Sequence, residues 1–97
     1  IRDSYTAAAN RFRIVIEDFK STNQTPEALH RLVESYLSLG LSEEAQSAGA
    51  VLKLNYKTTD WYNESYNLLS GQGLKPVPFG TNWLTTIYRQ MIKGQWL

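Results

Sequence analysis

The sequence predicts an all-α fold built from about five helices that repeat as an α-solenoid. Apolar residues recur three and four positions apart over most of the 97 residues, as on one face of a helix. No segment keeps the apolar–polar alternation of a strand, and Gly, Pro and polar clusters separate the periodic segments. Hydrophobic residues make up 42% of the chain and charged residues 20%, which is enough apolar material for a core.

The first predicted helix spans residues 2–19 and is followed by a polar break over 20–24. Its apolar residues fall on one face of a helix: Tyr5, Ala8, Ala9, Phe12, Val15, Ile16 and Phe19. Arg11 and Arg13 give this helix a basic side next to the core position Phe12. Arginine is well suited to bind carboxylates at a protein interface, because its planar guanidinium group donates two parallel hydrogen bonds. Both arginines are kept as candidate partner-binding residues, although the residues by themselves favour a surface charge at Arg11.

Two further helices are predicted at residues 25–39 and 42–56. Thr25 is the expected N-cap of the first of them, with Pro26 at its first turn, and Gly40 ends it. The other has small residues on its inner face, which let helices approach closely. We therefore expect mutual contacts among Leu32, Tyr36, Ala45 and Gly49. Aromatic residues at helical spacing are expected in the core: Phe12, Phe19, Tyr36, Tyr56 and Tyr66.

The C-terminal part is predicted as a helix at 60–70, a Gly/Pro-rich loop from residue 71, and a last helix at 82–93. Thr59 or Asp60 is expected to cap the helix at 60–70. Trp83 is expected to fold back as a cap on the open end of the solenoid, whereas Trp96 has no clear role. Residues 71–97 are thus interpreted as a loop and a C-terminal capping helix.

Residues 1–70 carry the spacing of a tetratricopeptide (TPR) repeat. The repeat positions are Leu29, Leu32, Tyr36, Gly40 and Ala45. Ala8 corresponds to Ala45 at an offset of 37 residues, slightly longer than the usual period of about 34. Residues 1–70 are therefore interpreted as the second half of one repeat, one full repeat and the start of the next.

Composition argues against most chemical functions. The net charge of +1 gives no support to nucleic-acid binding, and the absence of Cys excludes disulfides and Cys-based zinc sites or nucleophiles. His30 has Glu34 four residues on, and we expect a solvated pair rather than a catalytic dyad or a metal site. Paired acids such as Asp60 and Glu64 fit the dipole of a helix N-terminus. No catalytic residue, metal or cofactor is predicted, and the chain is not expected to be an enzyme.

In a TPR array the first helix of each pair lines the concave face, where a peptide or protein partner can bind. On the predicted helix at 25–39 this face offers Glu27, His30, Glu34, Leu37 and Ser38. The alternative is a solvated polar stripe. The sequence does not decide between a peptide groove and such a stripe.

Several linked segments resemble the BamD family, the TPR lipoproteins of the bacterial outer-membrane β-barrel assembly machinery. They are Asn10-Arg11-Phe12, residues 27–29, residues 36–41 and residues 55–62. Lys20 and Lys57 stand where the family usually has Pro. The resemblance implies a scaffold at the periplasmic face of the outer membrane, anchored by a lipid at an N-terminus beyond this chain. It also implies that Arg11 lies against a POTRA domain of the partner BamA, with other assembly subunits nearby.

Two other readings of the sequence stay open at this point. One is an unrelated TPR adaptor or co-chaperone module. The other is a helical domain that acts on peptidoglycan through a single carboxylic acid, although no Glu lies in an apolar context. Because residue 1 is Ile and helical periodicity starts at once, the chain is expected to be a piece of a longer protein.

Overall fold

A computed structural model describes residues 2–19 and 22–95, with the side chains of residues 2 and 19 excepted. Five helices make up the fold: α1 (Arg2–Phe19), α2 (Thr25–Ser38), α3 (Ser42–Asn55), α4 (Asp60–Ser70) and α5 (Trp83–Ile92). No strand occurs among the described residues, so the predicted all-α class and the helix count are confirmed. The helix bounds differ from the predicted ones by at most one residue at either end.

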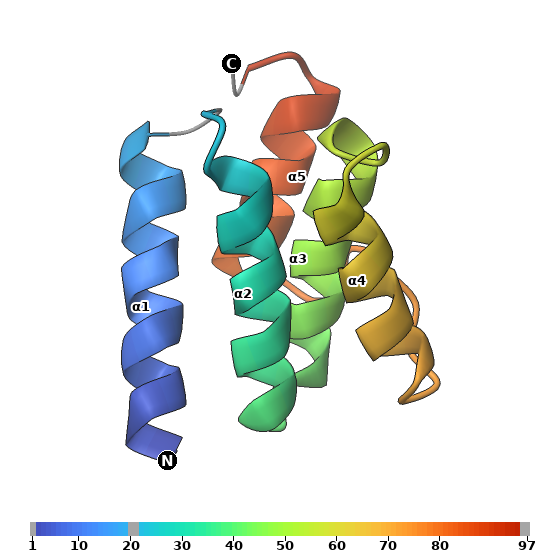
Figure 1. Cartoon of the computed structure of the whole chain (residues 1–97). Helices are drawn as coiled ribbons and strands as arrows, with labels where there is room; N and C mark the ends of the chain where they lie inside the picture. Colours follow the sequence, from blue (N-terminus) through green and yellow to red (C-terminus); the bar gives the residue numbers. More distant parts are fainter. Residues whose placement is uncertain (1, 20–21, 96–97) are drawn as a thin grey trace.

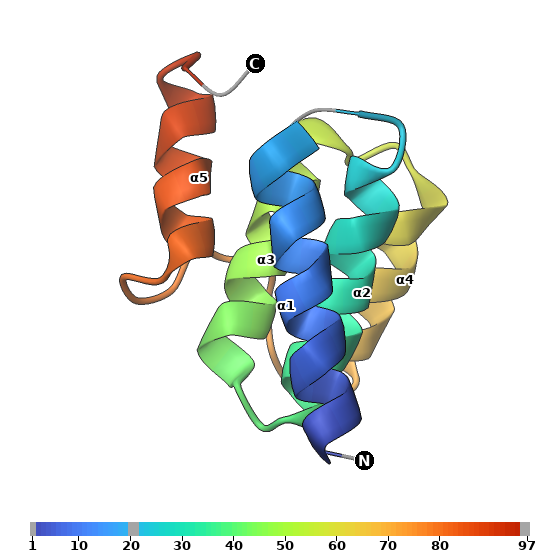
Figure 2. The same cartoon turned by 90° about the vertical axis from the view of Figure 1, so that its left-hand side faces the viewer.

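Helix α2 is the centre of the arrangement, because it packs against α1, α3 and α4 (Figure 1). The last helix departs from a regular repeat. Of the described helices, only α3 packs closely against α5, and α4 and α5 lie on opposite sides of α3 (Figure 2). Residues 71–82 therefore cross α3 between the two helices, and the chain does not stack α5 on its predecessor.

The core lies where α2 meets its neighbours. Leu29, Leu32 and Val33 are fully buried on α2, as are Ala45 and Ala48 on α3. Burying each large apolar side chain contributes about 1.5–3 kcal/mol. The core cluster also takes in Ala9 and Ile16 from α1, Tyr62 and Leu69 from α4, and Leu84 and Ile87 from α5. All five helices thus share one core.

Local signals account for most helix ends. Gly40 has φ +76° after α2, and the Leu41 amide donates back to the Tyr36 carbonyl at 2.8 Å, which is the expected glycine stop. Thr59 caps α4, since its hydroxyl accepts from the Tyr62 amide at 3.2 Å. Thr25 does not cap α2, contrary to the prediction. It is the first helical residue, and its hydroxyl accepts from the Thr22 amide in the preceding turn instead.

Gly49 is close-packed, but its closest neighbours are not those predicted from the repeat. A Cβ built at this position would lie 2.7 Å from Leu69 Cδ1 of α4 and 3.1 Å from Pro76 Cβ of the loop after α4. The missing side chain at Gly49 therefore lets α4 and the loop at residues 71–82 pack closely against α3, and it does not make room for Tyr36 or Leu32. Tyr36 is 8% exposed, and its hydroxyl accepts a hydrogen bond from Trp83 of α5.

Two other expectations about aromatic residues have different outcomes. Trp83 folds back onto the core cluster, but beside α1 and α2 rather than on the outer side of α4, so its role as a cap on the open end of the solenoid stays a prediction. Tyr66 is 47% exposed, so its prediction as a core residue is wrong: it lies on the outer side of α4, which no later helix covers in this structure. The Phe19 side chain and Trp96 lie outside the described residues. The division into repeats at 1–70 and a capping part at 71–97 stays a prediction.

Candidate protein-docking surfaces

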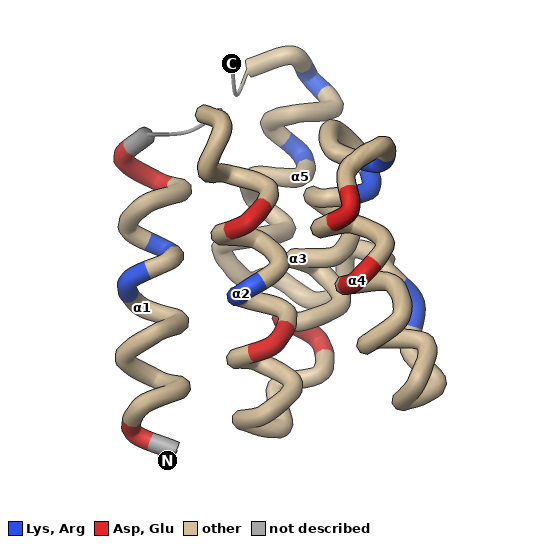
Figure 3. The backbone as a smooth tube through the Cα atoms, in the orientation of Figure 1, with Lys and Arg blue, Asp and Glu red and all other residues tan. Residues whose placement is uncertain are grey.

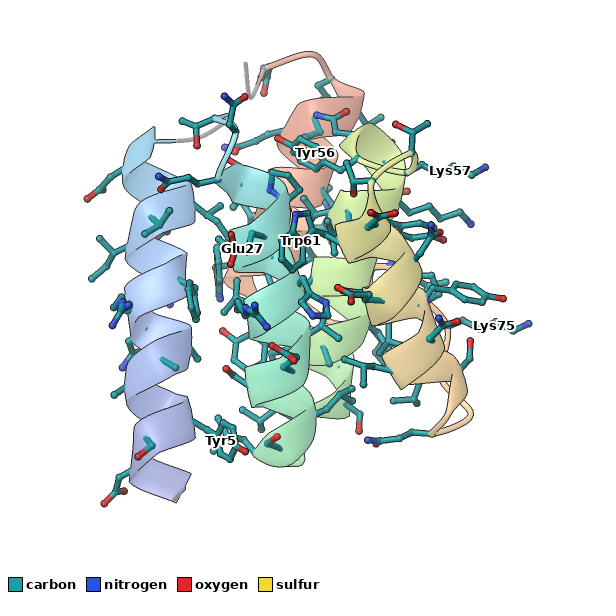
Figure 4. The ribbon with its side chains drawn as sticks, viewed as in Figure 1. Tyr5, Glu27, Tyr56, Lys57, Trp61 and Lys75 are labelled. Carbon is teal, nitrogen blue, oxygen red and sulfur yellow. The ribbon has the colours of Figure 1, made fainter. Side chains whose placement is uncertain are left out.

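Arg11 lies beside a small pocket between α1 and α2. The pocket has a volume of about 270 Å³ and is lined by Arg11, Phe12, Val15, Gln24, Glu27 and Ala28. Phe12, Val15 and Ala28 give it an apolar part, and Arg11 and Glu27 bring opposite charges to it. Glu27 lies between the ribbons of α1 and α2 in Figure 4. The structure thus brings together two of the residues that the sequence singled out, Arg11 and Glu27.

Arg13 lies elsewhere on α1. Its Nε is 3.0 Å from Glu17 Oε1, and its guanidinium carbon is 5.0 Å from the centre of the Trp83 ring. Two residues along a helix are separated by about 200° of rotation, so Arg11 and Arg13 point to different edges of α1. The expected single basic side of this helix is therefore wrong, although Figure 3 shows two basic positions close together along the backbone of α1.

A larger groove runs over α2 between α1 and α4, with a volume of about 530 Å³. Tyr5 and Phe12 line it from α1, Glu34 and Leu37 from α2, and Leu68 from α4. Figure 4 shows Tyr5 reaching from α1 toward α2. The predicted face of α2 thus borders a real groove at Glu34, Leu37 and Ser38.

Arg31, which the sequence analysis did not single out, is the basic residue of this face. Its guanidinium group is 2.9 Å from Glu34 and 3.6 Å from Glu27, and it lies over the Trp61 ring at 5.4 Å. Figure 3 shows this alternation of charges as one blue segment between two red ones along α2. The charges are spaced i, i+4 from Glu27 to Arg31 and i, i+3 from Arg31 to Glu34. This spacing was visible in the sequence and could have identified Arg31 as part of this face.

His30 is buried, so the predicted solvated pair with Glu34 is wrong. The side chain is 4% exposed, and its Nδ1 lies 2.7 Å from the Ser65 hydroxyl of α4. Its Nε2 is 3.6 Å from Glu34 and 3.9 Å from Glu64. Helix α4 covers the face of α2 on which His30 lies, which the sequence of α2 alone could not reveal. His30 therefore presents almost no surface to a partner.

Burial also sets the charge state of His30. Loss of hydration lowers the pKa of the imidazole below its usual value of 6.5, and Arg31 lowers it further. The carboxylates of Glu34, Glu64 and Glu27 oppose this shift, but the pKa is lowered on balance. At neutral pH the neutral ring therefore shares one hydrogen bond with Ser65, and its centre lies 5.5 Å from that of the Trp61 ring, with the two planes tilted by 40°.

Other kinds of site have little support in the described ranges 2–19 and 22–95. They contain no group of three or more His, Cys, Asp or Glu side chains that could hold a metal ion. In the same ranges no helix has both the length and the hydropathy to cross a bilayer. The arrangement offers two surface hollows with charged rims, which suit contacts with another protein.

Comparison with known proteins agrees with the all-helical fold. A family model described as an outer membrane lipoprotein, YfiO, matches residues 1–52. An outer membrane protein assembly factor BamD from Caulobacter vibrioides is 53% identical over 70 residues, which is 72% of this chain and 23% of that protein. The protein of the same name from Rickettsia prowazekii is 48% identical over 63 residues, 65% of this chain and 25% of that protein.

No solved structure matches the chain significantly. The chain spans about a quarter of the length of the curated relatives that it matches. The family match covers more than half of the chain and includes three of the four segments that carry the sequence resemblance, at residues 10–12, 27–29 and 36–41. The chain therefore belongs to the BamD (YfiO) family of outer membrane lipoproteins.

Proposed function

We propose that this chain is part of a non-enzymatic scaffold for the assembly of outer-membrane β-barrel proteins, working at the periplasmic face of the outer membrane. Its relatives are named as outer membrane protein assembly factors, which supports this function over an unrelated TPR adaptor or a peptidoglycan-acting enzyme. The chain contributes a rigid helical surface, since its five helices share one core. A lipid attached outside this chain would hold the whole protein at the membrane.

We further propose that helix α1 docks a POTRA domain of a BamA-like subunit through Arg11. The observation that carries this proposal is a difference among three arginines. Arg13 and Arg31 form ion pairs with glutamates of their own helices, whereas Arg11 has no ion pair with any residue in the described part of the chain. Its guanidinium carbon lies 5.9 Å from the centre of the neighbouring Phe12 ring, and its N–H groups would bind a carboxylate of the partner bidentately.

The pocket beside Arg11 would take an apolar side chain next to that carboxylate. Phe12, Val15 and Ala28 supply the apolar contact, and Glu27 at the rim would orient a donor group of the partner. In this arrangement Arg13 contributes less, since Glu17 and Trp83 already engage it. Glu27 and Arg11 are the primary contacts of the proposed interface.

The test is charge reversal of Arg11 in the full-length protein, with binding to the partner's POTRA region followed by calorimetric titration. Removing one member of a desolvated charge pair costs about 2–5 kcal/mol. Arg11→Glu should therefore lower the affinity at least about tenfold, because 1.4 kcal/mol corresponds to tenfold. Arg13→Glu should have a smaller effect. Lys53→Glu, an exposed charge reversal on α3, is the matched control and should bind as the parent protein does.

Each variant also needs a melting curve, so that weak binding is not confused with unfolding. A folded Arg11→Glu variant that binds normally would remove α1 from the proposed interface. The groove of about 530 Å³ over α2 would then be the next surface to test, because Glu34 and Leu37 border it. Leu37→Asp, half-buried at that groove, would weaken binding if a peptide of the partner lies there.

A further inference from the structure

Trp83 is the point at which the C-terminal segment reaches the proposed docking helix. Its indole Nε1 donates a hydrogen bond to the Tyr36 hydroxyl of α2 at 3.1 Å. Its ring lies 5.0 Å from the guanidinium carbon of Arg13 on α1. A cation near an aromatic face at this distance is attracted by the ring's charge distribution. One side chain of α5 therefore contacts both α1 and α2.

Helix α1 has few other attachments. Among the described helices it packs closely against α2 alone, whereas α2 and α3 each have three packed neighbours. A helix held along one line of contact can roll about its own axis more easily than one held on two sides. The Trp83–Arg13 contact comes from α5, a helix that does not otherwise pack closely against α1, so it gives α1 a second point of attachment.

The segment that precedes Trp83, residues 75–82, is bound to α3 by several hydrogen bonds. The Ser47 hydroxyl donates to the Phe79 carbonyl at 3.1 Å, and the Phe79 amide donates to the same hydroxyl at 3.0 Å. The Gln46 amide group donates to the Lys75 carbonyl at 3.1 Å, and Pro76 lies against Gly49. Asn82 caps α5 through the amides of Leu84 and Thr85. Trp83 is therefore the first helical residue on a segment tied down at several points.

A small roll of α1 would move Arg11 by a distance that matters for recognition. Side chains end about 5–6 Å from a helix axis, so a roll of about 20° shifts a surface group by roughly 2 Å. A hydrogen bond to a carboxylate tolerates a change of only a few tenths of an ångström around about 2.8 Å. Fixing the rotation of α1 would thus fix whether Arg11 stands at the pocket rim.

We propose that Trp83 is a positioning residue for the docking surface: its contacts with Arg13 and Tyr36 hold α1 in the rotation that presents Arg11 beside the Glu27 pocket. This inference rests on the proposed function, because it assumes that Arg11 binds the partner. It gives the C-terminal segment a role in binding without requiring that the partner touches α5.

The experiment is a double-mutant cycle in the full-length protein, with the affinity for the partner's POTRA region measured by calorimetry. Trp83→Ala should lower the affinity about fivefold, within the range of coupling between linked residues. In the Arg11→Gln background the same change should alter the affinity less than about twofold, because Trp83 can no longer act through the position of Arg11. A purely structural role would give the same factor in both backgrounds.

Conservative variants separate the two contacts of Trp83. Trp83→Phe keeps a ring for Arg13 but loses the hydrogen bond to Tyr36, and should retain most of the binding. Tyr36→Phe removes the same hydrogen bond from the other side and is its matched partner. Arg13→Gln removes the ring contact from an exposed position, so it tests the idea even if Trp83→Ala fails to fold. It should reproduce the loss caused by Trp83→Ala.

The outcomes distinguish this inference from the proposed function. If Arg11→Gln leaves binding unchanged, docking through Arg11 is wrong and the inference is overturned with it. If Arg11→Gln weakens binding while folded Trp83→Ala and Arg13→Gln bind as the parent does, Trp83 does not position Arg11 and the docking proposal stands. Equal losses from Trp83→Ala with and without Arg11 would likewise overturn the positioning role.

Discussion

Helix α2 meets the rest of the molecule through an apolar face and through a polar side toward α4. On the apolar face Leu29, Leu32 and Val33 are fully buried in the same cluster as Ala45 and Ala48 of α3. On the side toward α4, His30 is 4% exposed and hydrogen-bonded to Ser65. Both contacts are buried, but the first depends on volume and the second on hydrogen bonding and charge state.

The difference shows that one helix can make one contact whose strength does not depend on pH and another whose strength does. Apolar contacts do not change between pH 5 and pH 8, so the core should keep its strength across that range. The contact with α4 contains a group that titrates there. Glu34 and Glu64 stand near the ring's other nitrogen and would meet a protonated His30.

Truncating the apolar face should have the largest effect on stability. Leu32→Ala removes buried methyl groups from a side chain with no exposed surface and leaves a cavity, which costs about 2–5 kcal/mol. Urea unfolding of the variant and the parent would give this difference. The matched control is Leu68→Ala on α4, at the edge of the groove over α2, where the side chain is 39% exposed and should lose much less. Equal losses would contradict the central position of α2.

Overpacking at Gly49 should destabilise the junction of α3, α4 and the crossing loop. An added Cβ would lie 2.7 Å from Leu69 Cδ1 and 3.1 Å from Pro76, so a larger side chain must displace both. Gly49→Leu should cost on the order of 1–3 kcal/mol. Thermal melting would show the loss, with the exposed Ala7→Leu on α1 as the control. An unchanged melting temperature would mean that the loop does not press on α3.

Removing the partner of His30 should have a smaller but clear effect. Ser65→Ala leaves the imidazole Nδ1 buried without its hydrogen bond to the Ser65 hydroxyl, at a cost of about 1–3 kcal/mol. The cost should fall at the lower end of that range if water reaches the ring. Ser70→Ala, at an exposed position of the same helix, controls for the change of residue type. Chemical denaturation at pH 8 would measure both variants with His30 neutral.

The contact with α4 should also make stability depend on pH. Because the pKa of His30 is lowered in the folded protein, the unfolded chain binds the proton more tightly. This contribution to stability is fully present above about pH 6.5, the ordinary pKa of histidine, and declines as the pH falls from there toward the folded pKa. His30→Asn, which keeps a polar atom near Ser65, should flatten the profile between pH 5.5 and 8. A parent protein with no slope in that range would contradict the buried neutral ring.

Helix positions were predictable from this sequence because they depend on local patterns. Apolar spacing, Gly40 and the polar breaks set the five helices to within a residue at each end, and the spacing from Leu29 to Ala45 indicated the repeat. The candidate residues Arg11, Glu27 and Glu34 line surface hollows, which the sequence had left undecided for the face of α2. Their role in binding stays a prediction.

The sequence predictions that were wrong have a common cause. His30, Tyr66 and the neighbours of Gly49 were judged from their own helix, but their surroundings are set by α4 and the segment that follows it. Periodicity says which side of a helix is apolar and gives no information about which other helix covers a polar position. Arg11 and Arg13 were likewise grouped by sequence proximity, whereas a separation of two residues places them on different edges of α1.

The sequence by itself determined the all-helical class, the helix bounds, the apolar stripes and the family, since each depends on residue order over short distances. The tertiary structure decided where the last helix goes. Residues 71–82 cross α3, so α5 packs against α3 and brings Trp83 to Arg13 and Tyr36, which lie 70 and 47 positions away in the sequence. Contacts between residues so far apart in the sequence depend on how the helices pack against one another. Local sequence patterns contain no information about that packing.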